Sequence, residues 1–257
     1  MEFGMPTLLE AADLDACVAL CKELGLNFIE LNMNLPAYQA DALDLERLGR
    51  LQNQEGIFFT FHLDENLNVC DFNRLVAEAY TATVLQTIEA AKRCSAPVLN
   101  LHMAKGVYFT LPDRRVFLFE QYRDGYLRAL LQFRNACEAA IGDSGILLCV
   151  ENTNGYPAFA REGISLLLES PAFALTLDTG HSLCAKFADE PFILSHGRLA
   201  HMHLHDATGG RDHLPLGGGD LPVERYLSLA KANDCRVVLE TKTIDGLRES
   251  VHFLRRL

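Results

Sequence analysis

Acidic and imidazole side chains stand at or near the end of most of the short apolar runs that predict β-strands in this sequence. Burying several carboxylates together is costly, because like charges repel and lose hydration, and a bound cation removes that cost. Imidazole combined with carboxylate suits Zn, Mn, Fe or Co better than Mg or Ca. We therefore predict a divalent-metal site of one to three ions. The strand-end residues are Glu30, His62, His102, Glu151, Asp178, His203 and Glu240.

Further donors lie beside these strand ends. His181 closes the segment Asp178-Thr179-Gly180-His181, and Asp212-His213 lies in the loop after the seventh predicted strand. Strand alternation places His201 and His205 on the inward face. We interpret His201 as too deep in the barrel to reach a ligand, and Glu30 as a contact behind the ligands or on a lid. Any one of these residues alone is more often a capping or hydrogen-bonding group.

The elements that must position these residues alternate along the chain. Helical patterns with apolar residues at i, i+3, i+4 and i+7 separate the apolar runs, and such alternation predicts parallel strands. A Gly-rich phosphate turn, which would favour an open sheet, is missing: Gly217-Gly218-Gly219 comes late and lacks a lysine. The sequence therefore predicts one α/β domain over residues 1–257, a (β/α)₈ TIM barrel of typical length. Its strands are expected over residues 3–9, 28–33, 57–62, 98–102, 146–151, 173–178, 199–205 and 236–240, and its last helix over 246–256.

Charge and composition narrow the class of partner. The formal net charge is −11, with 23 basic and 34 acidic residues, which disfavours nucleic acid, since basic side chains supply most of that affinity. The eight cysteines form no CxxC pair, as expected for reduced thiols. The first residues lack the features of a signal peptide, and no apolar run approaches the ~20 residues that cross a bilayer. We expect a cytoplasmic enzyme with a small-molecule substrate, no membrane association and, as a common arrangement, a homodimer.

Several short motifs together resemble the xylose-isomerase-like barrel superfamily, which includes the endonuclease IV branch (AP endonuclease family 2). They cover essentially the whole chain, and their order and spacing carry the resemblance. The motifs are Phe28-Ile29-Glu30-Leu31-Asn32, Glu151-Asn152-Thr153, Asp178-Thr179-Gly180-His181, His203-Leu204-His205-Asp206, His213-Leu214-Pro215-Leu216-Gly217 and Val238-Leu239-Glu240.

The resemblance implies a metal core made of Glu151, Asp178, His203 and Glu240. It further implies a second ion on His62 and His102, bridged by Glu151, and a third on His181 and His213, as in the endonuclease branch. One departure concerns the third ion. The branch has Asp-x-His in this loop, whereas here Arg211 occupies the matching place and Asp212 directly precedes His213.

We predict hydrolysis of a small-molecule phosphodiester as the main function. Two ions can activate water and stabilise the attacking and leaving oxygens. His62 and His102, which add to the four-residue core, favour hydrolysis because they could bind the second ion. Residues 61–67 and 106–115 are similar to bacterial phosphodiesterases that cut the nucleotide loop of cobamides. Glu151 and Glu240 are the predicted catalytic residues. Substrate contacts are expected from Glu30, Lys105, Arg114, Arg115 and His205, with the three basic residues on a phosphate.

The alternative is a metal-dependent sugar (phosphate) isomerase or epimerase. It would use one ion to polarise a carbonyl, while Glu151 and Glu240 act as the acid/base pair. The extra histidines would then bind substrate hydroxyls. Two further readings, a binding module without chemistry and repair of abasic DNA, are disfavoured by the complete core and by the net charge.

Overall fold

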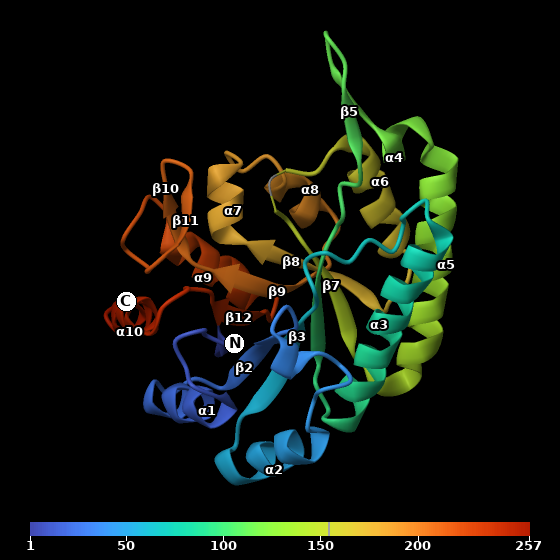
Figure 1. Cartoon of the computed structure of the whole chain (residues 1–257). Helices are drawn as coiled ribbons and strands as arrows, with labels where there is room; N and C mark the ends of the chain where they lie inside the picture. Colours follow the sequence, from blue (N-terminus) through green and yellow to red (C-terminus); the bar gives the residue numbers. More distant parts are fainter. Residues whose placement is uncertain (154) are drawn as a thin grey trace.

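Eight parallel strands close into a barrel in the computed structural model (Figure 1), which describes residues 1–153 and 155–257. Around the barrel the strand order is β1-β12-β9-β8-β7-β4-β3-β2, and each adjacent pair is parallel. The predicted single-domain (β/α)₈ barrel is thereby confirmed. The strands are β1 (Glu2–Pro6), β2 (Phe28–Asn32), β3 (Phe58–His62), β4 (Val98–His102), β7 (Leu147–Glu151), β8 (Phe173–Asp178), β9 (Leu199–Leu204) and β12 (Arg236–Leu239).

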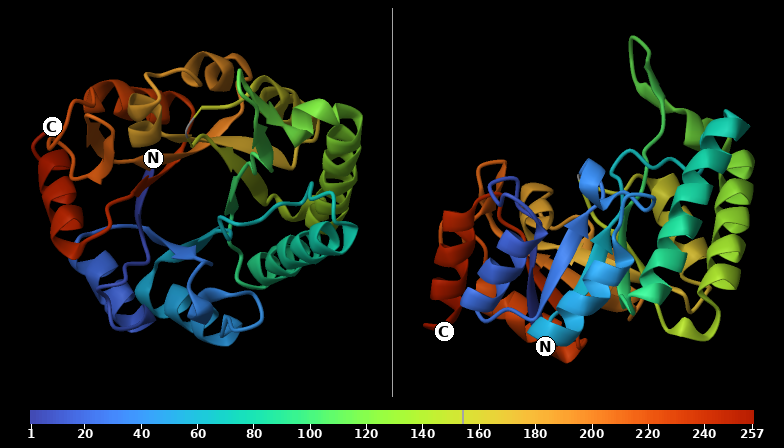
Figure 2. Two further views of the ribbon diagram at one scale, coloured as in Figure 1. Left: turned by 45° about the horizontal axis from the view of Figure 1, so that its top comes forward. Right: turned by 60° about the horizontal axis from the view of Figure 1, so that its bottom comes forward.

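Helices form the outer ring of the barrel (Figure 2). Several begin at a side chain that accepts a bond from an otherwise unpaired backbone N–H, such as Asp13 from Ala16 and Asp44 from Arg47. The second of these helices ends at Gly56 in the left-handed conformation, with φ of 67°. The helices are α1 (Leu14–Glu23), α2 (Leu45–Glu55), α3 (Arg74–Arg93), α4 (Leu118–Gln121), α5 (Arg123–Ile141), α6 (Ala158–Leu167), α7 (Thr179–Cys184), α8 (Glu190–Ser195), α9 (Val223–Ala232) and α10 (Ile244–Leu254), with 3₁₀ turns η1 (Pro36–Tyr38) and η2 (Gly142–Ser144).

Two short antiparallel ribbons interrupt the regular barrel. One pairs β5 (Tyr108–Thr110) with β6 (Arg115–Phe117), and the other pairs β10 (Asp206–Thr208) with β11 (Arg211–Leu214). The sequence predicts loops for both segments, because strands of three or four residues are too short for a readable alternation. Both ribbons follow strands that carry predicted metal donors, so they shape the rim of the barrel mouth.

The apolar core fills the layer between strands and helices, whereas the barrel interior is partly polar. Phe59 and Phe61 of β3 are fully buried, while Thr60 between them is buried on the opposite, inward face beside Glu30. Cysteines add to the core, and all eight are free thiols. Among the residues that the structure describes, no helix combines the length and the apolar character needed to cross a bilayer.

Candidate metal centre

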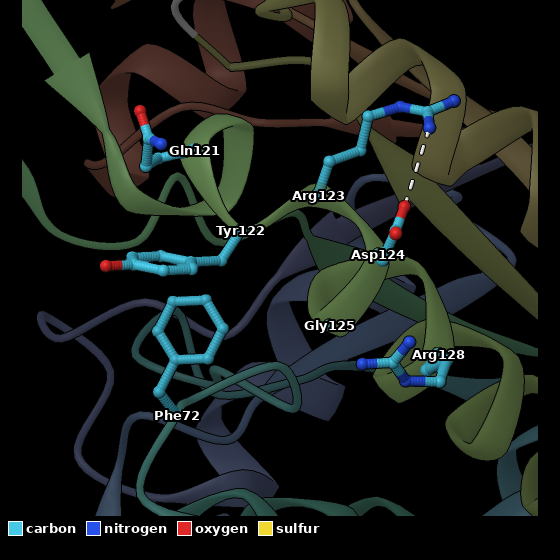
Figure 3. A pocket seen from close by; sticks show the side chains of 7 residues that line it. All are labelled: Phe72, Gln121, Tyr122, Arg123, Asp124, Gly125 and Arg128. Carbon is cyan, nitrogen blue, oxygen red and sulfur yellow. Dashed lines mark ion pairs between the residues drawn. The ribbon is translucent and has the colours of Figure 1, made fainter.

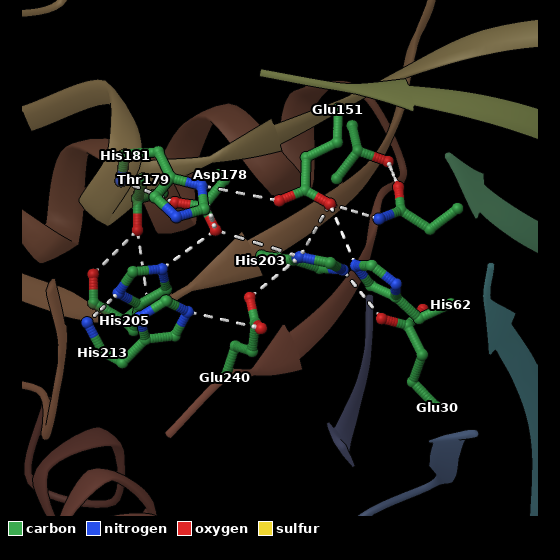
Figure 4. A network of polar contacts seen from close by, with 12 residues as sticks. Glu30, His62, Glu151, Asp178, Thr179, His181, His203, His205, His213 and Glu240 are labelled. Carbon is green, nitrogen blue, oxygen red and sulfur yellow. Dashed lines mark hydrogen bonds and ion pairs between the residues drawn. The ribbon is translucent and has the colours of Figure 1, made fainter. Parts of the chain in front are cut away.

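Four strand ends bring together the predicted metal core. Glu151 ends β7, Asp178 ends β8, His203 lies near the end of β9, and Glu240 directly follows β12. Each offers a ligand atom, and the four atoms lie within 4.8 Å of one another (Figure 4). The strand pairing sets this convergence, since Asp178 and His203 are direct neighbours across β8 and β9. All four residues are buried.

His203 Nδ1 lies at the centre of the group. It is 3.0 Å from Glu240 Oε2, 3.4 Å from Glu151 Oε2 and 3.9 Å from Asp178 Oδ2. Nevertheless, Nδ1 and Glu240 Oε2 are both buried without a hydrogen-bond partner of acceptable geometry among the described residues. Buried polar atoms are normally satisfied. Atoms that face one another without hydrogen bonding fit ligands arranged around a shared cation, so these four residues suit a divalent ion.

The electrostatics support the same conclusion. Burial alone would raise the pKa of Glu151 and Glu240, but the neighbouring histidines, His203 first, hold both pKa values well below their usual range. Burial lowers the pKa of His203, yet the surrounding carboxylates outweigh it and raise that pKa well above its ordinary value. The pocket therefore keeps its carboxylates ionised and demands positive charge, from protonated imidazoles or from a metal ion.

A second donor group adjoins the core on the side of β3 and β4. His62 Nε2 lies 3.4 Å and His102 Nε2 3.1 Å from Glu151 Oε2, the same oxygen that faces His203. His62 Nδ1 lies 2.9 Å from the carbonyl oxygen of Leu63. If Nδ1 donates to that carbonyl, Nε2 is left with a free lone pair directed at the site. The structure thus brings His62, His102 and Glu151 together as the sequence predicted.

A third donor group is made of His181, Asp212 and His213. Asp212 Oδ1 lies 2.9 Å from His213 Nδ1, and Asp212 Oδ2 lies 3.6 Å from His181 Nε2. The β10–β11 ribbon places Asp212 beside the two histidines. In the endonuclease branch the corresponding aspartate stands one residue earlier, where this chain has Arg211. The sequence analysis named Asp212 beside His213 as a further donor, but the ligands that the resemblance implied for a third ion include His213 and not Asp212. Arg211 itself is exposed.

Buried residues hold the donors from behind. Glu30, expected to contact substrate, lies 2.8 Å from His203 Nε2 and 2.9 Å from His201 Nε2, and also accepts from Thr60. Its two oxygens are thus engaged by neighbouring side chains. Glu30 therefore positions His203, and His201 lies deep in the barrel as predicted.

His205, also expected to contact substrate, lies fully buried between two donors. Its Nε2 is 2.9 Å from Asp178 Oδ2, and its Nδ1 accepts a hydrogen bond of 2.8 Å from the backbone N–H of His213. The ring also stacks on that of His213, with centroids 4.2 Å apart. Gly180 allows this arrangement, since a Cβ there would overlap the His205 ring. His205 therefore links two donor groups.

Two asparagines that the sequence analysis missed complete this support. Asn100 donates to Glu151 Oε2 and accepts from Thr176. Asn152 accepts from the backbone N–H of Asp178 and donates to its carbonyl oxygen. The sequence could have indicated both asparagines. Asn100 shares the inward face of its strand with His102, and Asn152 directly follows the predicted ligand Glu151.

The predicted basic contacts all follow β4, and two of them belong to the exposed β5–β6 ribbon. Arg114 and Arg115 are exposed on the β5–β6 ribbon, where Arg114 pairs with Asp113 at 2.8 Å and the Arg115 guanidinium lies over the Tyr108 ring. Lys105, at the base of the ribbon, is partly buried, and burial lowers its pKa against the opposing charge of Asp189.

A lysine that we did not predict does reach the core. Lys242 Nζ lies 2.9 Å from Glu240 Oε1. Burial opposes the charge on Lys242, but Glu240 outweighs that effect and raises the pKa of the lysine. Lys242 lies two residues beyond the predicted ligand Glu240. The sequence therefore places it near the core, but it does not show that the side chain points toward Glu240.

A cavity of about 450 Å³ opens beside the donors. His62 and Glu240 reach it from the metal core, and Asn34, Glu65 and Lys242 add polar groups. Glu30 also lines the cavity, and the rest of the wall combines apolar residues (Pro6, Leu8, Leu9 and Leu35) with polar ones (Thr7, Asn32 and Thr241). A cavity of this size suits a small molecule.

Comparison with known proteins settles the family. Residues 18–257 match the model of the family described as xylose isomerase-like TIM barrel. The chain belongs to this family. Among curated proteins, no sequence matches the chain.

Solved structures share this xylose isomerase-like barrel along the whole chain. A D-tagatose 3-epimerase-like protein aligns with a TM-score of 0.80 at 21% identity, covering 100% of this chain and 96% of that one. The 3-keto-D-glucoside 4-epimerase of E. coli aligns with a TM-score of 0.79 at 17% identity, covering 100% of both chains. A protein from Thermus thermophilus, soaked with ZnCl₂, aligns with a TM-score of 0.73 at 20% identity, covering 100% and 97%.

These likenesses correct the predicted reaction. The sequence favoured a phosphodiesterase, including one that acts on a cobamide nucleotide loop. The matched xylose isomerase-like structures instead include epimerases of tagatose, psicose, ribulose and keto-glucoside type. The prediction was wrong because it gave decisive weight to His62 and His102, whereas donors beside a core do not by themselves fix the reaction that the core performs.

Proposed function

We propose that the protein is a metal-dependent epimerase or isomerase of a small keto sugar. The observation that carries this proposal is the placement of Glu151 and Glu240 on either side of His203 Nδ1, at 3.4 and 3.0 Å. Epimerisation next to a carbonyl needs a base on one face of a carbon and an acid on the other. We assign these roles to the carboxylates at the ends of β7 and β12, two strands that β8 and β9 separate.

Oε2 of both glutamates faces His203 Nδ1 in the core. In the proposed reaction Oε1 of each glutamate exchanges the proton, and Glu240 Oε1 also accepts a hydrogen bond from Lys242 and lies 3.4 Å from His213 Nε2. Behind Glu151 Oε1 lies His181 Nδ1 at 3.6 Å, and behind Glu240 Oε1 lies Lys242 Nζ at 2.9 Å. These neighbours favour the ionised carboxylate, which is the form in which one glutamate accepts the proton. The other glutamate must carry a proton at that moment to donate it to the opposite face of the carbon, so the two exchange protonation states in each turnover. A divalent ion bound by the core supplies Lewis-acid polarisation of the carbonyl oxygen.

The metal content proposed is one to three ions of Zn, Mn, Fe or Co type. The core of Glu151, Asp178, His203 and Glu240 alone suffices for the proposed chemistry. The groups His62–His102–Glu151 and His181–Asp212–His213 offer further sites. Glu151 belongs both to the first of these groups and to the core, so its carboxylate would help to hold an ion at either site.

The setting that we propose is the cytoplasm, with a small-molecule substrate and no nucleic acid. Eight free thiols support a reducing compartment. The net charge of −11 supports the exclusion of a polynucleotide. Residues 1–257 form one domain in this proposal.

Hydrogen exchange tests the function directly. Metal-loaded protein is incubated in deuterated water with D-tagatose, D-fructose, D-psicose, L-ribulose and a 3-keto-glucoside, and NMR follows the proton next to the carbonyl. We expect deuterium incorporation and a new epimer with at least one sugar. Glu240→Gln should lower the rate by about 10²–10⁴-fold through loss of one acid/base group. No exchange with any of these sugars, at confirmed metal content, would contradict the proposal.

A further inference from the structure

A second cavity adjoins the cavity beside the metal core. Its volume is about 420 Å³, and it lies between the segment that follows β1 and the segment that follows β2. Leu8, Leu9 and Leu35 line both cavities, so the two lie side by side at the end of the barrel that carries the donors. Cavities of about 300–1,000 Å³ hold drug-sized ligands. The two together therefore offer more space than a monosaccharide fills.

The second cavity is lined mainly by apolar side chains. Besides the three shared leucines, they include Pro36, Ala37 and Leu43. Leu9 at the border of the two cavities is 84% exposed, so a ligand that covers it would remove a large apolar surface from water. This lining favours an apolar group as the occupant of the second cavity.

The charged residues of the second cavity are already engaged with other groups. Asp13 and Asp44 each accept a hydrogen bond of 2.9 Å from a backbone N–H and cap the N-termini of α1 and α2. Arg47 forms an ion pair of 2.7 Å with Asp15. The two aspartates thus occupy the helix ends at which an anionic ligand would otherwise bind. A phosphate or carboxylate group is therefore disfavoured in this cavity.

The cavity beside the metal core differs from the second cavity in its polar side chains. Asn34 Nδ2 donates to Glu65 Oε1 at 3.3 Å, and the backbone N–H of Glu65 donates to Asn34 Oδ1 at 3.1 Å. Both residues line the cavity beside the metal core together with Lys242. Amide, carboxylate and ammonium groups can all form hydrogen bonds with sugar hydroxyls. The two cavities together suit a ligand with a polar sugar at one end and an apolar group at the other.

We propose that the substrate is a glycoside of a keto sugar, with its sugar in the cavity beside the metal core and an apolar aglycone in the second cavity. A glycosidic bond at the carbonyl carbon would remove the carbonyl group, so the oxo group stands on a ring carbon other than the anomeric one. The aglycone then leaves the reacting carbons accessible to Glu151 and Glu240. This inference rests on the proposed function and narrows its substrate class.

A groove beside α4 and α5 provides a control for nonspecific binding of an apolar group (Figure 3). Its volume is about 740 Å³, and Phe72 and Tyr122 expose about half of their side chains there. Within the described part of the chain, the groove shares no lining residue with the cavity beside the metal core. Binding of an apolar chain in this groove would therefore be independent of a sugar at the core.

Calorimetry with methyl and hexyl β-D-glucosides tests the second cavity without requiring turnover. We expect the metal-loaded protein to bind the hexyl glucoside at least about 10-fold more tightly, because its chain buries apolar surface. Ala37→Asp and Ala12→Asp, at exposed positions that line only the second cavity, should each abolish this preference by placing a charge against the chain. Tyr122→Asp, in the groove beside α4 and α5, should keep it.

Circular dichroism checks that each of these variants is folded. Equal affinity of the wild type for the two glucosides would overturn the proposal. A preference that survives both alanine substitutions, or one that is lost in Tyr122→Asp, would overturn it as well, since the chain would then bind outside the second cavity.

Hydrogen exchange separates this inference from the proposed function. Methyl and hexyl 3-keto-glucosides are incubated with the metal-loaded protein in deuterated water, and NMR follows the proton next to the carbonyl. We expect kcat/KM to be at least about 10-fold higher for the hexyl compound, with the difference lost in Ala37→Asp. Equal kcat/KM values would overturn the aglycone site and leave the proposed function intact. Tighter binding of the hexyl glucoside without exchange of either keto compound would support the aglycone site and contradict the proposed reaction.

Discussion

Glu30 Oε1 lies 2.8 Å from His203 Nε2, on the side of the imidazole opposite the nitrogen that faces the other core ligands. A carboxylate behind a metal-binding histidine fixes its tautomer and orientation and raises its basicity. Thr60 and His201 contact Glu30 Oε2 and keep the carboxylate in place. The pair Glu30–His203 therefore sets the geometry of the core from the barrel interior.

We expect Glu30→Gln to weaken metal binding by about 10–100-fold while the protein stays folded. The amide keeps the shape of the side chain but loses the charge that holds His203. Titration of apo protein with Zn²⁺ or Mn²⁺ by calorimetry measures the effect. Glu46→Gln, a matched change on the exposed face of α2, serves as the control. Equal affinities for both variants would show that Glu30 does not position His203.

His62 and His102 should affect substrate binding more than the chemical step. In the proposed epimerase both histidines lie beside the core and His62 also lines the cavity, whereas Glu151 and Glu240 transfer the proton. We expect His62→Ala to raise KM several-fold and to change kcat little, and elemental analysis should show no loss of the core ion. A fall in kcat as large as that of Glu240→Gln would instead place this histidine in the reaction itself.

The fold was readable because it depends on repeated local patterns. Apolar runs that alternate with amphipathic helices predicted the closed barrel, and all strand limits but one agree with the structure to within one residue. The first strand was expected over residues 3–9 and lies at Glu2–Pro6. The two ribbons escaped prediction because strands of three or four residues depend on cross-strand pairing, which sequence spacing does not reveal.

The donors were readable because strand ends of a barrel meet at one face. The residues that hold these donors in place could not be predicted in the same way. Asn100 and Asn152 look like ordinary polar residues in the sequence, and only the strand register shows that they contact Glu151 and Asp178. Asp212 was named beside His213 as a donor, but its contact with His181, at 3.6 Å, depends on the pairing of the β10–β11 ribbon and was not predicted. The predicted reaction was wrong because the number of metal donors was taken as evidence for a two-metal hydrolysis.

Removal of the metal should lower thermal stability. An ion that binds only the native state at 100 times its Kd adds about 2.7 kcal/mol, which corresponds to about 5–10 °C in Tm for a chain of this size. Calorimetric scans with and without chelator, at verified metal loss, measure the shift. Asp178→Asn should show a smaller response to the chelator than wild type. Identical Tm values for the loaded and stripped wild type would argue against a native metal site.

Gly180 tests how tightly the donors are packed. A Cβ at this position would overlap the buried ring of His205, whose Nε2 is 2.9 Å from Asp178 Oδ2. Overpacking of a filled site costs about 1–3 kcal/mol, so we expect Gly180→Ala to lower both the free energy of unfolding and the metal affinity. Gly49→Ala in α2 is the matched control, because a Cβ there meets nothing within 4 Å and a helix-interior alanine is favoured over glycine by about 1 kcal/mol. Urea unfolding should therefore move in opposite directions for the two variants. If Gly180→Ala were as stable as wild type and bound metal equally well, His205 could shift freely and would not link Asp178 to His213.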